Sequence, residues 1–567
     1  MPNKKNSRAA AAPATRQRMR PVGRRSKTAG ANPARQKDFS TLLSSFWKFA
    51  RPKKVATQSG ALWREAVRIA RGVSELEPDP KDARFRDPVW KENPYYRSLA
   101  QAYLAVSKSL EGMIERDAPW QAVEREKLLV EILTSAMSPT NTLLGNPQAI
   151  KRFFETGGQS LVSGIKNMLR DAAKNRGMPS QVDATPFAVG RNLAVSPGQV
   201  VFRNEVLELL QYQPSTEQVF QRPTLIVTPQ INKFYFLDLA PGRSFVEFSV
   251  AQGIQTFVVS WRNPGPRQRD WNLDTYLAAV LECVTAVCRI TGSRDVNAFG
   301  FCAGGITMAA LASHLVSRGD PRFATLSFAV TLLDLGTPAL IGILNSPRLL
   351  DIARARSSKK GVIEGRDLAS VFSWLRPNDL VWNYWVNNYL LGKSPPSFDV
   401  LAWNSDCTNL PAGLHGDFLN IFQHNPLVTP GAWCALGTPV DLGRITCDAF
   451  VTGAMTDHLT PWKGCYRTTQ LLGGDTTFVL SYSGHVASLI NPPSNPKSSY
   501  WTGPKALPDS DEWLRKAKQQ PGSWWTAWAE WIGGRSGERK TAPRELGHAD
   551  FPPLAAAPGS YVLRAPG

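Results

Sequence analysis

The feature that most constrains the fold is the hexapeptide GFCAGG at residues 300–305, which separates a β-type run from a helical pattern. β-Branched and aromatic residues are frequent over 295–299, and apolar residues recur at helical spacing over 303–316. Glycines two residues before and two after Cys302 allow a strand and a helix to approach closely at a strained turn. This turn predicts an exposed Cys302 nucleophile at a helix N-terminus, where the Ala303 amide is placed to donate to an oxyanion.

A nucleophile on such a turn needs a carboxylate and then a histidine, each on a loop that follows a later strand. The segment GAMTDHLTPW supplies Asp457 after a β-type run at 449–452, and SGHVASLINPP supplies His485 after a run at 477–481. This order predicts an α/β-hydrolase fold with a triad of Cys302, Asp457 and His485. His458 shares the loop of Asp457, and two interpretations stay open: a supporting role beside the thiol, or a purely structural one.

A second oxyanion donor is expected in the loop after the third core strand, which is TPQINKFYFLDL at 228–239. The turn at Pro229 is followed by Ile231 and Asn232, and Asn232 is the candidate for this supporting role. The sequence does not distinguish its amide from that of its neighbour. An ordinary β-to-α loop is an equally good interpretation.

From about residue 201 onward, strand and helix patterns alternate, which indicates βαβ units and a mainly parallel sheet of the α/β class. Predicted strands cover 224–228, 256–261, 295–299, 326–333, 449–452 and 477–481, and predicted helices cover 273–290 and 303–316. The alternation stops between about 335 and 446, where Trp, Asn and Pro are frequent. We expect this insertion to form a lid over the carboxyl ends of the strands, within a catalytic domain at 201–567.

Two further segments are expected before the catalytic domain. Residues 41–200 carry apolar side chains at spacings of three and four, which is typical of a mostly helical domain. Residues 1–40 are expected to be a disordered basic tail, since the first 37 residues hold 11 cations and no acid. The rest of the chain holds 55 of the 66 cations and all 46 acids, which leaves a net charge of +9. Over half of the total net charge of +20 therefore lies in the first 37 residues. The tail either contacts nucleic acid or an anionic surface, or has no specific ligand.

Composition also narrows the compartment and the kind of site. Seven cysteines without a CxxC spacing argue against a disulfide scaffold and a zinc ribbon, so we expect a cytoplasmic protein with no metal site. No run of about 18 apolar residues is present, which argues against a membrane-spanning helix.

A thiol nucleophile favours acyl transfer from a coenzyme A thioester, because a thioester acyl-enzyme is close in energy to that substrate. A transferase must also exclude water, and an aromatic lid serves that purpose. Two alternatives stay open. One is a Cys-dependent hydrolase that acts on an ester, lactone or polyester through the same triad. The other is a granule-surface or nucleic-acid-binding protein whose basic tail is the working part.

Together these segments resemble the polyhydroxyalkanoate synthases, over roughly residues 80–535. The resemblance rests on GFCAGG, GAMTDHLTPW, SGHVASLINPP, PQINKFY (229–235), SWRNP (260–264), WNYWVNNYLLG (382–392) and FRDPVWKENPYYR (85–97). NKFYFLDL and WVNNYLLG are most similar to the single-subunit, medium-chain type. The preference between short and medium substrates is not settled by the sequence.

This resemblance implies an acyltransferase that polymerises (R)-3-hydroxyacyl-CoA into polyester and releases coenzyme A. It implies that Cys302 is acylated, with Asp457 and His485 as its partners. It further implies a homodimer on cytoplasmic storage granules, in contact with granule-associated proteins. No cofactor is implied, since coenzyme A is part of the substrate and a product. Whether one thiol or two carry the growing chain stays open.

Overall fold

The computed structural model describes residues 52–338, 342, 345–505 and 507–564. The chain divides into two compact units, Met1–Thr57 and Gln58–Gly567, and every element that positions the site belongs to the second. The predicted tail at 1–40 and the first part of the predicted helical domain at 41–200 lie outside the described residues. The boundaries of these two segments therefore stay predictions.

The described chain is helical up to Lys174, and asparagine–proline pairs start two of its helices. Asn93 accepts hydrogen bonds from the amides of Tyr95 and Tyr96, while Pro94 occupies the first position of α4. Asn146 caps α6 in the same manner. The elements are α2 (Pro52–Ala70), η1 (Ala83–Phe85), α3 (Val89–Glu92), α4 (Pro94–Glu111), α5 (Trp120–Met137), η2 (Pro139–Asn141), α6 (Pro147–Glu155) and α7 (Gln159–Lys174).

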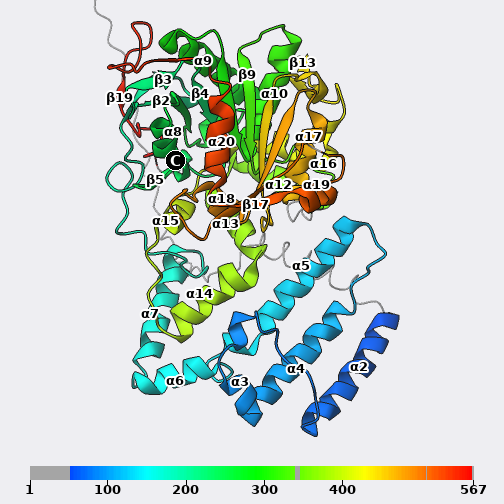
Figure 1. Ribbon diagram of the computed structural model, residues 1–567. Coiled ribbons are helices and arrows are strands. Elements are labelled where there is room, and N and C mark those ends of the chain that lie inside the picture. The colour runs from blue at the N-terminus through cyan, green and yellow to red at the C-terminus, as the bar shows by residue number, and fades with distance from the viewer. Residues whose placement is uncertain (1–51, 339–341, 343–344, 506, 565–567) are drawn as a thin grey trace, which may run out of the picture. The chain divides into compact units, whose positions relative to one another are not determined.

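An 11-stranded sheet forms the centre of the second unit (Figure 1). In sheet order its strands are β19 (Ala555–Ala556), β1 (Gly198–Arg203), β2 (Leu207–Tyr212), β7 (Thr256–Trp261), β4 (Thr224–Val227), β8 (Val296–Phe301), β9 (Phe323–Ala329), β14 (Ala449–Ala454), β15 (Thr476–Ser481), β16 (Ser499–Thr502) and β17 (Lys518–Pro521). The six strands from β7 to β15 are parallel, with Ala449 of β14 opposite Leu326 of β9 and Thr476 of β15. Their carboxyl ends therefore meet at the same edge, which brings the loops after β8, β14 and β15 together.

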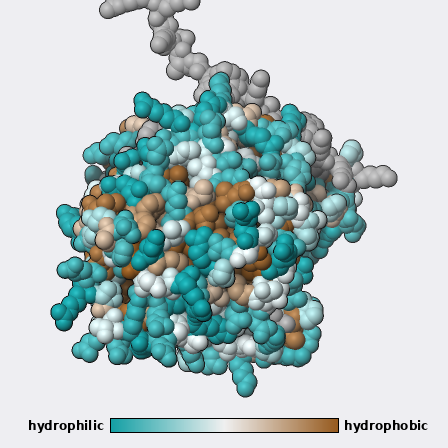
Figure 2. Space-filling model, turned by 90° about the horizontal axis from the view of Figure 1, so that it is seen from above, coloured by the Kyte–Doolittle hydropathy of each residue, from teal (hydrophilic) through white to brown (hydrophobic). Residues whose placement is uncertain are grey.

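Both faces of the sheet are buried, and successive side chains of a strand point to opposite faces. Phe257 and Val259 belong to one apolar cluster, whereas Val258 between them belongs to another. The first cluster includes side chains of α9 (Leu273–Thr291), α10 (Ala303–Ser317) and α17 (Trp462–Leu471), and the second includes side chains of α8 (Phe245–Ala251) and α20 (Trp524–Gly533). Burial on both faces explains the nearly continuous apolar runs of the parallel strands. On the face seen in Figure 2, hydrophobic residues reach the surface in patches between hydrophilic ones.

The chain between β9 and β14 leaves the sheet and forms elements of its own. They are α12 (Pro347–Lys360), β10 (Val362–Ile363), α13 (Gly365–Trp374), the π-helix η5 (Asn378–Trp382), α14 (Asn383–Trp385), the π-helix η6 (Val386–Leu390), α15 (Asp399–Ser405), β11 (Leu410–Pro411), α16 (Ala412–His424), η7 (Pro426–Val428), β12 (Cys434–Ala435), β13 (Thr438–Pro439) and η8 (Leu442–Arg444). We call residues 335–446 the lid segment. Its bounds as a lid stay a prediction.

The lid segment packs against helix α7. The Asn167 side chain donates to the carbonyl oxygens of Asn388 and Lys393, at 3.0 Å each. Gly164 lies so close to η6 that a Cβ on it would be 2.7 Å from the carbonyl carbon of Tyr389. A glycine and polar side chains thus join the N-terminal helices to the lid segment.

Smaller elements complete the unit. They are β3 (Gln218–Phe220), η3 (Phe234–Leu237), β5 (Asp238–Ala240), β6 (Arg243–Ser244), η4 (Pro266–Gln268), α18 (His485–Leu489), α19 (Ser510–Lys516) and β18 (Arg539–Thr541).

The predicted α/β class is confirmed, and all six predicted strands and both predicted helices are present. The largest difference concerns 326–333, because β9 ends at Ala329 and Val330 turns away with a φ of 46°. Strand β2 is not among the predicted strands, because Glu208 interrupts its apolar run. That carboxylate is buried because Arg203 and the hydroxyl of Ser560 bind it.

Candidate active site

Cys302 lies between the last residue of β8 and the first residue of α10, with a φ of 48°. L-residues rarely adopt this conformation, so the surrounding backbone must hold it. The Cys302 amide donates to the Ala329 carbonyl oxygen at 2.9 Å, and the Thr331 hydroxyl donates to the Cys302 carbonyl oxygen at 3.1 Å. These bonds fix the predicted nucleophile at the start of α10.

The glycines around Cys302 are required by close backbone approaches. A Cβ on Gly300 would lie 2.5 Å from the Cα of Gly305 in α10. A Cβ on Gly304 would lie 2.6 Å from the carbonyl oxygen of Thr228, in the loop after β4. The spacing that singled out this hexapeptide therefore reflects the contact of one helix with two strand ends.

Asp457 and His485 follow the neighbouring strands β14 and β15, which places them side by side. His485 Nδ1 is 2.6 Å from Asp457 Oδ2, and the two side chains are 12% and 0% exposed. Because a carboxylate can only accept, Nδ1 is the nitrogen that carries a proton. This leaves Nε2 for Cys302, whose thiol interacts with the same imidazole.

The two partners shift each other's pKa in opposite directions. Burial alone would lower the pKa of His485, but the charge of Asp457, their hydrogen bond and the contact with Cys302 raise it to about 10. Burial alone would raise the pKa of Asp457, but His485 and the hydrogen bonds from Thr460 hold it below its ordinary value. The structure thus brings the three residues of the predicted triad together, with an ionised carboxylate behind a strongly basic imidazole.

His458, the predicted supporting residue, lies half-buried beside this pair. Its Nδ1 is buried and has no hydrogen-bond partner among the described residues. Burial and the positive charge of Arg376 lower the pKa of its imidazole, while Asp457 and Asp379 oppose this effect. Arg376 and Asp379 belong to the lid segment, so His458 lies between the triad and the lid. Its role stays a prediction.

The two predicted oxyanion donors differ in their present hydrogen bonds. The Ala303 amide is the first of α10 and donates no hydrogen bond within the described residues. The Asn232 amide donates to the Thr408 hydroxyl of the lid segment at 2.8 Å, and that hydroxyl donates to the Gln230 carbonyl oxygen. The Thr408 hydroxyl thus occupies the Asn232 amide in this structure, and an oxyanion role for Asn232 would require Thr408 to move away. The neighbouring Ile231 amide donates no hydrogen bond within the described residues.

Two tryptophans of the lid segment make packing contacts within the protein. The Trp403 indole donates to the Lys233 carbonyl oxygen at 2.7 Å and contacts Phe236 with ring centroids 5.5 Å apart. The Trp385 indole donates to the carbonyl oxygen of Asn141, in the N-terminal helices. These contacts favour a packing role for both side chains.

Thr460 also lies beside Asp457 and His485, although it is not among the predicted site residues. Its hydroxyl is 2.6 Å from Asp457 Oδ2 and 3.1 Å from His485 Nδ1. A threonine three residues after an aspartate in one loop was the available signal, because aspartates commonly accept bonds from the backbone just ahead of them.

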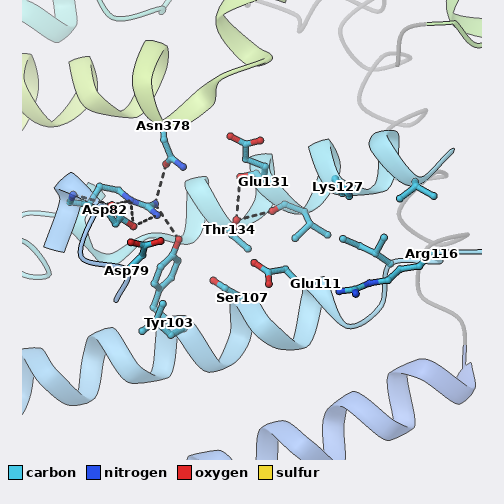
Figure 3. Close-up of a pocket in the computed structure, with 15 residues that line it drawn as sticks. Asp79, Asp82, Tyr103, Ser107, Glu111, Arg116, Lys127, Glu131, Thr134 and Asn378 are labelled. Carbon is cyan, nitrogen blue, oxygen red and sulfur yellow. Dashed lines mark hydrogen bonds and ion pairs between the residues drawn. The ribbon is translucent and has the colours of Figure 1, made fainter. Parts of the chain in front are cut away.

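A cavity of about 870 Å³ lies away from the triad, between α4 and α5 (Figure 3). No triad residue lines it. Arg84 lines this cavity; its guanidinium pairs with Asp82 and donates to the hydroxyl of Tyr103 and to Oδ1 of Asn378 in the lid segment. This cavity therefore marks another contact between the N-terminal helices and the lid segment.

Comparison with known proteins identifies the family. The family model described as the poly-beta-hydroxybutyrate polymerase (PhaC) N-terminus matches residues 81–249, and the alpha/beta hydrolase fold model matches residues 242–492. Poly(3-hydroxyalkanoate) polymerase 2 of Ectopseudomonas oleovorans is 48% identical, over 89% of this chain and 90% of its own. Polymerase 1 of that organism is 45% identical, over 94% and 97%. The polymerase subunit PhaC of Cupriavidus necator is 39% identical, over 88% and 86%. Both the predicted fold and the predicted resemblance are thereby confirmed, and the chain belongs to the poly(3-hydroxyalkanoate) polymerase family.

Proposed function

We propose that the chain is an acyltransferase that polymerises (R)-3-hydroxyacyl-CoA into polyester and releases coenzyme A. The observation that carries the proposal is the meeting of Cys302, His485 and Asp457 at one edge of the sheet, in a chain of this family.

In the proposed first step, His485 takes the proton of the Cys302 thiol and the sulfur attacks the thioester carbonyl carbon. Asp457 and the contact with Cys302 raise the pKa of His485, which favours the imidazolium and the thiolate that this transfer produces. The Ala303 amide donates to the oxyanion. When the carbon–sulfur bond to coenzyme A breaks, the leaving thiolate takes the proton from His485, and the acyl group stays on Cys302.

In the proposed second step, the 3-hydroxyl of another acyl unit attacks the acyl-enzyme. His485 accepts the hydroxyl proton, the new ester bond forms, and the proton returns to the Cys302 sulfur as the thioester breaks. Asp457 holds the imidazole and stabilises its charge throughout. The sequence of steps uses no metal or redox cofactor.

The partners and the location are further parts of the proposal. We propose a homodimer attached to cytoplasmic polyester granules and in contact with granule-associated proteins. Four exposed apolar side chains on α7 support contact with an apolar surface: Val162, Ile165, Met168 and Leu169. None of the helices in the described part of the chain is long and apolar enough to span a bilayer. For the tail at 1–37, contact with nucleic acid or an anionic surface is the minor proposal.

The test is release of coenzyme A from (R)-3-hydroxybutyryl-CoA and from (R)-3-hydroxyoctanoyl-CoA, with the product pelleted and checked for ester bonds. Polymer from either substrate supports the proposal, and the faster substrate sets the chain-length preference. Free hydroxy acid without polymer would instead establish a hydrolase. Cys302→Ala should abolish release, whereas Cys434→Ala, which removes an exposed thiol far along the chain, should not.

A further inference from the structure

The carboxylate of Asp457 is held by four hydrogen bonds. Oδ1 accepts from the amides of Leu459 at 2.8 Å and Thr460 at 3.0 Å. Oδ2 accepts from His485 Nδ1 and from the Thr460 hydroxyl, each at 2.6 Å. A carboxylate offers about four lone-pair sites, so the set is complete.

The four bonds are not equivalent for the reaction. The two amides hold only Oδ1, whereas Oδ2 is the oxygen that orients His485. Among the described residues, the Thr460 hydroxyl is the only group besides His485 itself that donates to Oδ2. In the proposed reaction the imidazole gains and loses a proton, while the hydroxyl stays the same. The Thr460 hydroxyl is thus the donor to Asp457 Oδ2 that does not change during the reaction.

Thr460 is itself firmly placed. It is buried, and its carbonyl oxygen accepts from the Cys465 thiol. The next residue, Pro461, forms a bridge with Ala454 at the end of β14 and precedes α17. A β-branched side chain on a fixed backbone has few rotamers, so the hydroxyl position is fixed as well.

We propose that Thr460 is a positioning residue, whose hydroxyl fixes Oδ2 of Asp457 and thereby the orientation of His485 toward Cys302. The inference rests on the proposed function, in which His485 is the base. At 3.1 Å from Nδ1, the same hydroxyl also lies beside the ring nitrogen that must carry the proton. Rotation of the carboxylate away from His485 would break the bond to this hydroxyl.

The first test compares variants of one side chain in polymerisation. Thr460→Val keeps the shape and removes the hydroxyl, and it should lower kcat about tenfold or more, because a bond to a charged group is lost. KM should stay within about twofold, since Thr460 acts through Asp457. Thr460→Ala should show the same loss if bulk is irrelevant, and Thr460→Ser should stay within about threefold of wild type. Thr468→Val is the matched control, because that buried hydroxyl on α17 has no partner within the described residues.

The second test needs no substrate. The rate at which iodoacetamide alkylates Cys302 is followed by peptide mass spectrometry, with exposed Cys434 as the internal reference. Thr460→Val should slow alkylation of Cys302 at least about threefold in the wild-type background and have no effect in an Asp457→Asn background.

Three results would overturn the inference. They are wild-type kcat and alkylation rate in Thr460→Val, an equal slowing of alkylation by Thr460→Val in the Asp457→Asn background, or a kcat of Thr460→Ser as low as that of Thr460→Val. If the wild-type protein makes no polymer, but Thr460→Val slows alkylation of Cys302 only when Asp457 is present, the proposed function is refuted. The positioning role of Thr460 is then supported.

Discussion

Replacing Gly304 by alanine should both destabilise the protein and slow its reaction. The added Cβ would lie 2.6 Å from the carbonyl oxygen of Thr228 and still closer to that of Val227, whereas ordinary contact begins at 3.4 Å. Both oxygens are backbone atoms, so no side-chain rotation relieves the overlap, and α10 must move about 0.8 Å or more from the loop after β4. Overpacking usually costs about 1–3 kcal/mol, and we expect the upper end of that range.

The same displacement moves the Cys302 sulfur and the Ala303 amide relative to His485. A misplacement of about 1 Å costs on the order of 100-fold in rate, so we expect a loss of that size in coenzyme A release. Urea unfolding followed by tryptophan fluorescence measures the stability, and a thiol assay measures the release.

The matched control is Gly416→Ala, also within a helix, where an added Cβ meets no atom within 4 Å. This variant should gain about 0.5–1 kcal/mol of stability and keep its rate. A Gly304→Ala protein with wild-type stability and rate would refute the argument that close approach of α10 shapes the site.

Four further predictions concern the triad residues and the buried core. His485→Gln should nearly abolish coenzyme A release. Asp457→Asn should slow elongation more than the first acylation, since the hydroxyl deprotonated in elongation is a weaker acid than the Cys302 thiol. The ratio of burst to steady-state coenzyme A release measures this difference. The pKa of His485 is raised from about 6.5 to about 10, so its pairing with Asp457 stabilises the fold fully below about pH 6.5 and loses this effect as the pH rises toward 10. The difference in free energy of unfolding between wild type and Asp457→Asn should therefore shrink over that pH interval in urea titrations, and a constant difference would contradict the assignment. Trp513→Ala should cost about 3–5 kcal/mol in the same titrations, because this fully buried ring packs on Tyr466 and Phe478.

The proximity of Cys302, Asp457 and His485 could be predicted from the sequence because each follows a strand within a short segment of local pattern. Cys302 lies between glycines, and Asp457 and His485 each follow a run of β-forming residues. The parallel strands were predictable for the same reason, since burial on both faces makes them apolar throughout.

Features that depend on distant partners could not be predicted. The Asn232 amide is engaged by Thr408, 176 residues later in the chain, and no local pattern indicates that bond. Strand β2 was missed because its buried Glu208 is stabilised by Ser560, near the other end of the chain. Thr460 was overlooked because a threonine in a loop is common, and only the distances to Asp457 and His485 reveal its place.

The bonds between α7 and the lid segment have a consequence for how such proteins can be recombined. Asn167 satisfies two carbonyl groups of the segment, and the Asn388 side chain in turn donates to the carbonyl oxygen of Ser180, just beyond α7. A lid segment transplanted into a relative without the N-terminal helices of this chain would lose these polar partners. It would also pack against a helix that need not have glycine at the position of Gly164, where the backbone of Tyr389 approaches too closely for any side chain. Chimeras that exchange residues 335–446 together with the N-terminal helices should therefore express as folded protein far more often than those that exchange either part alone.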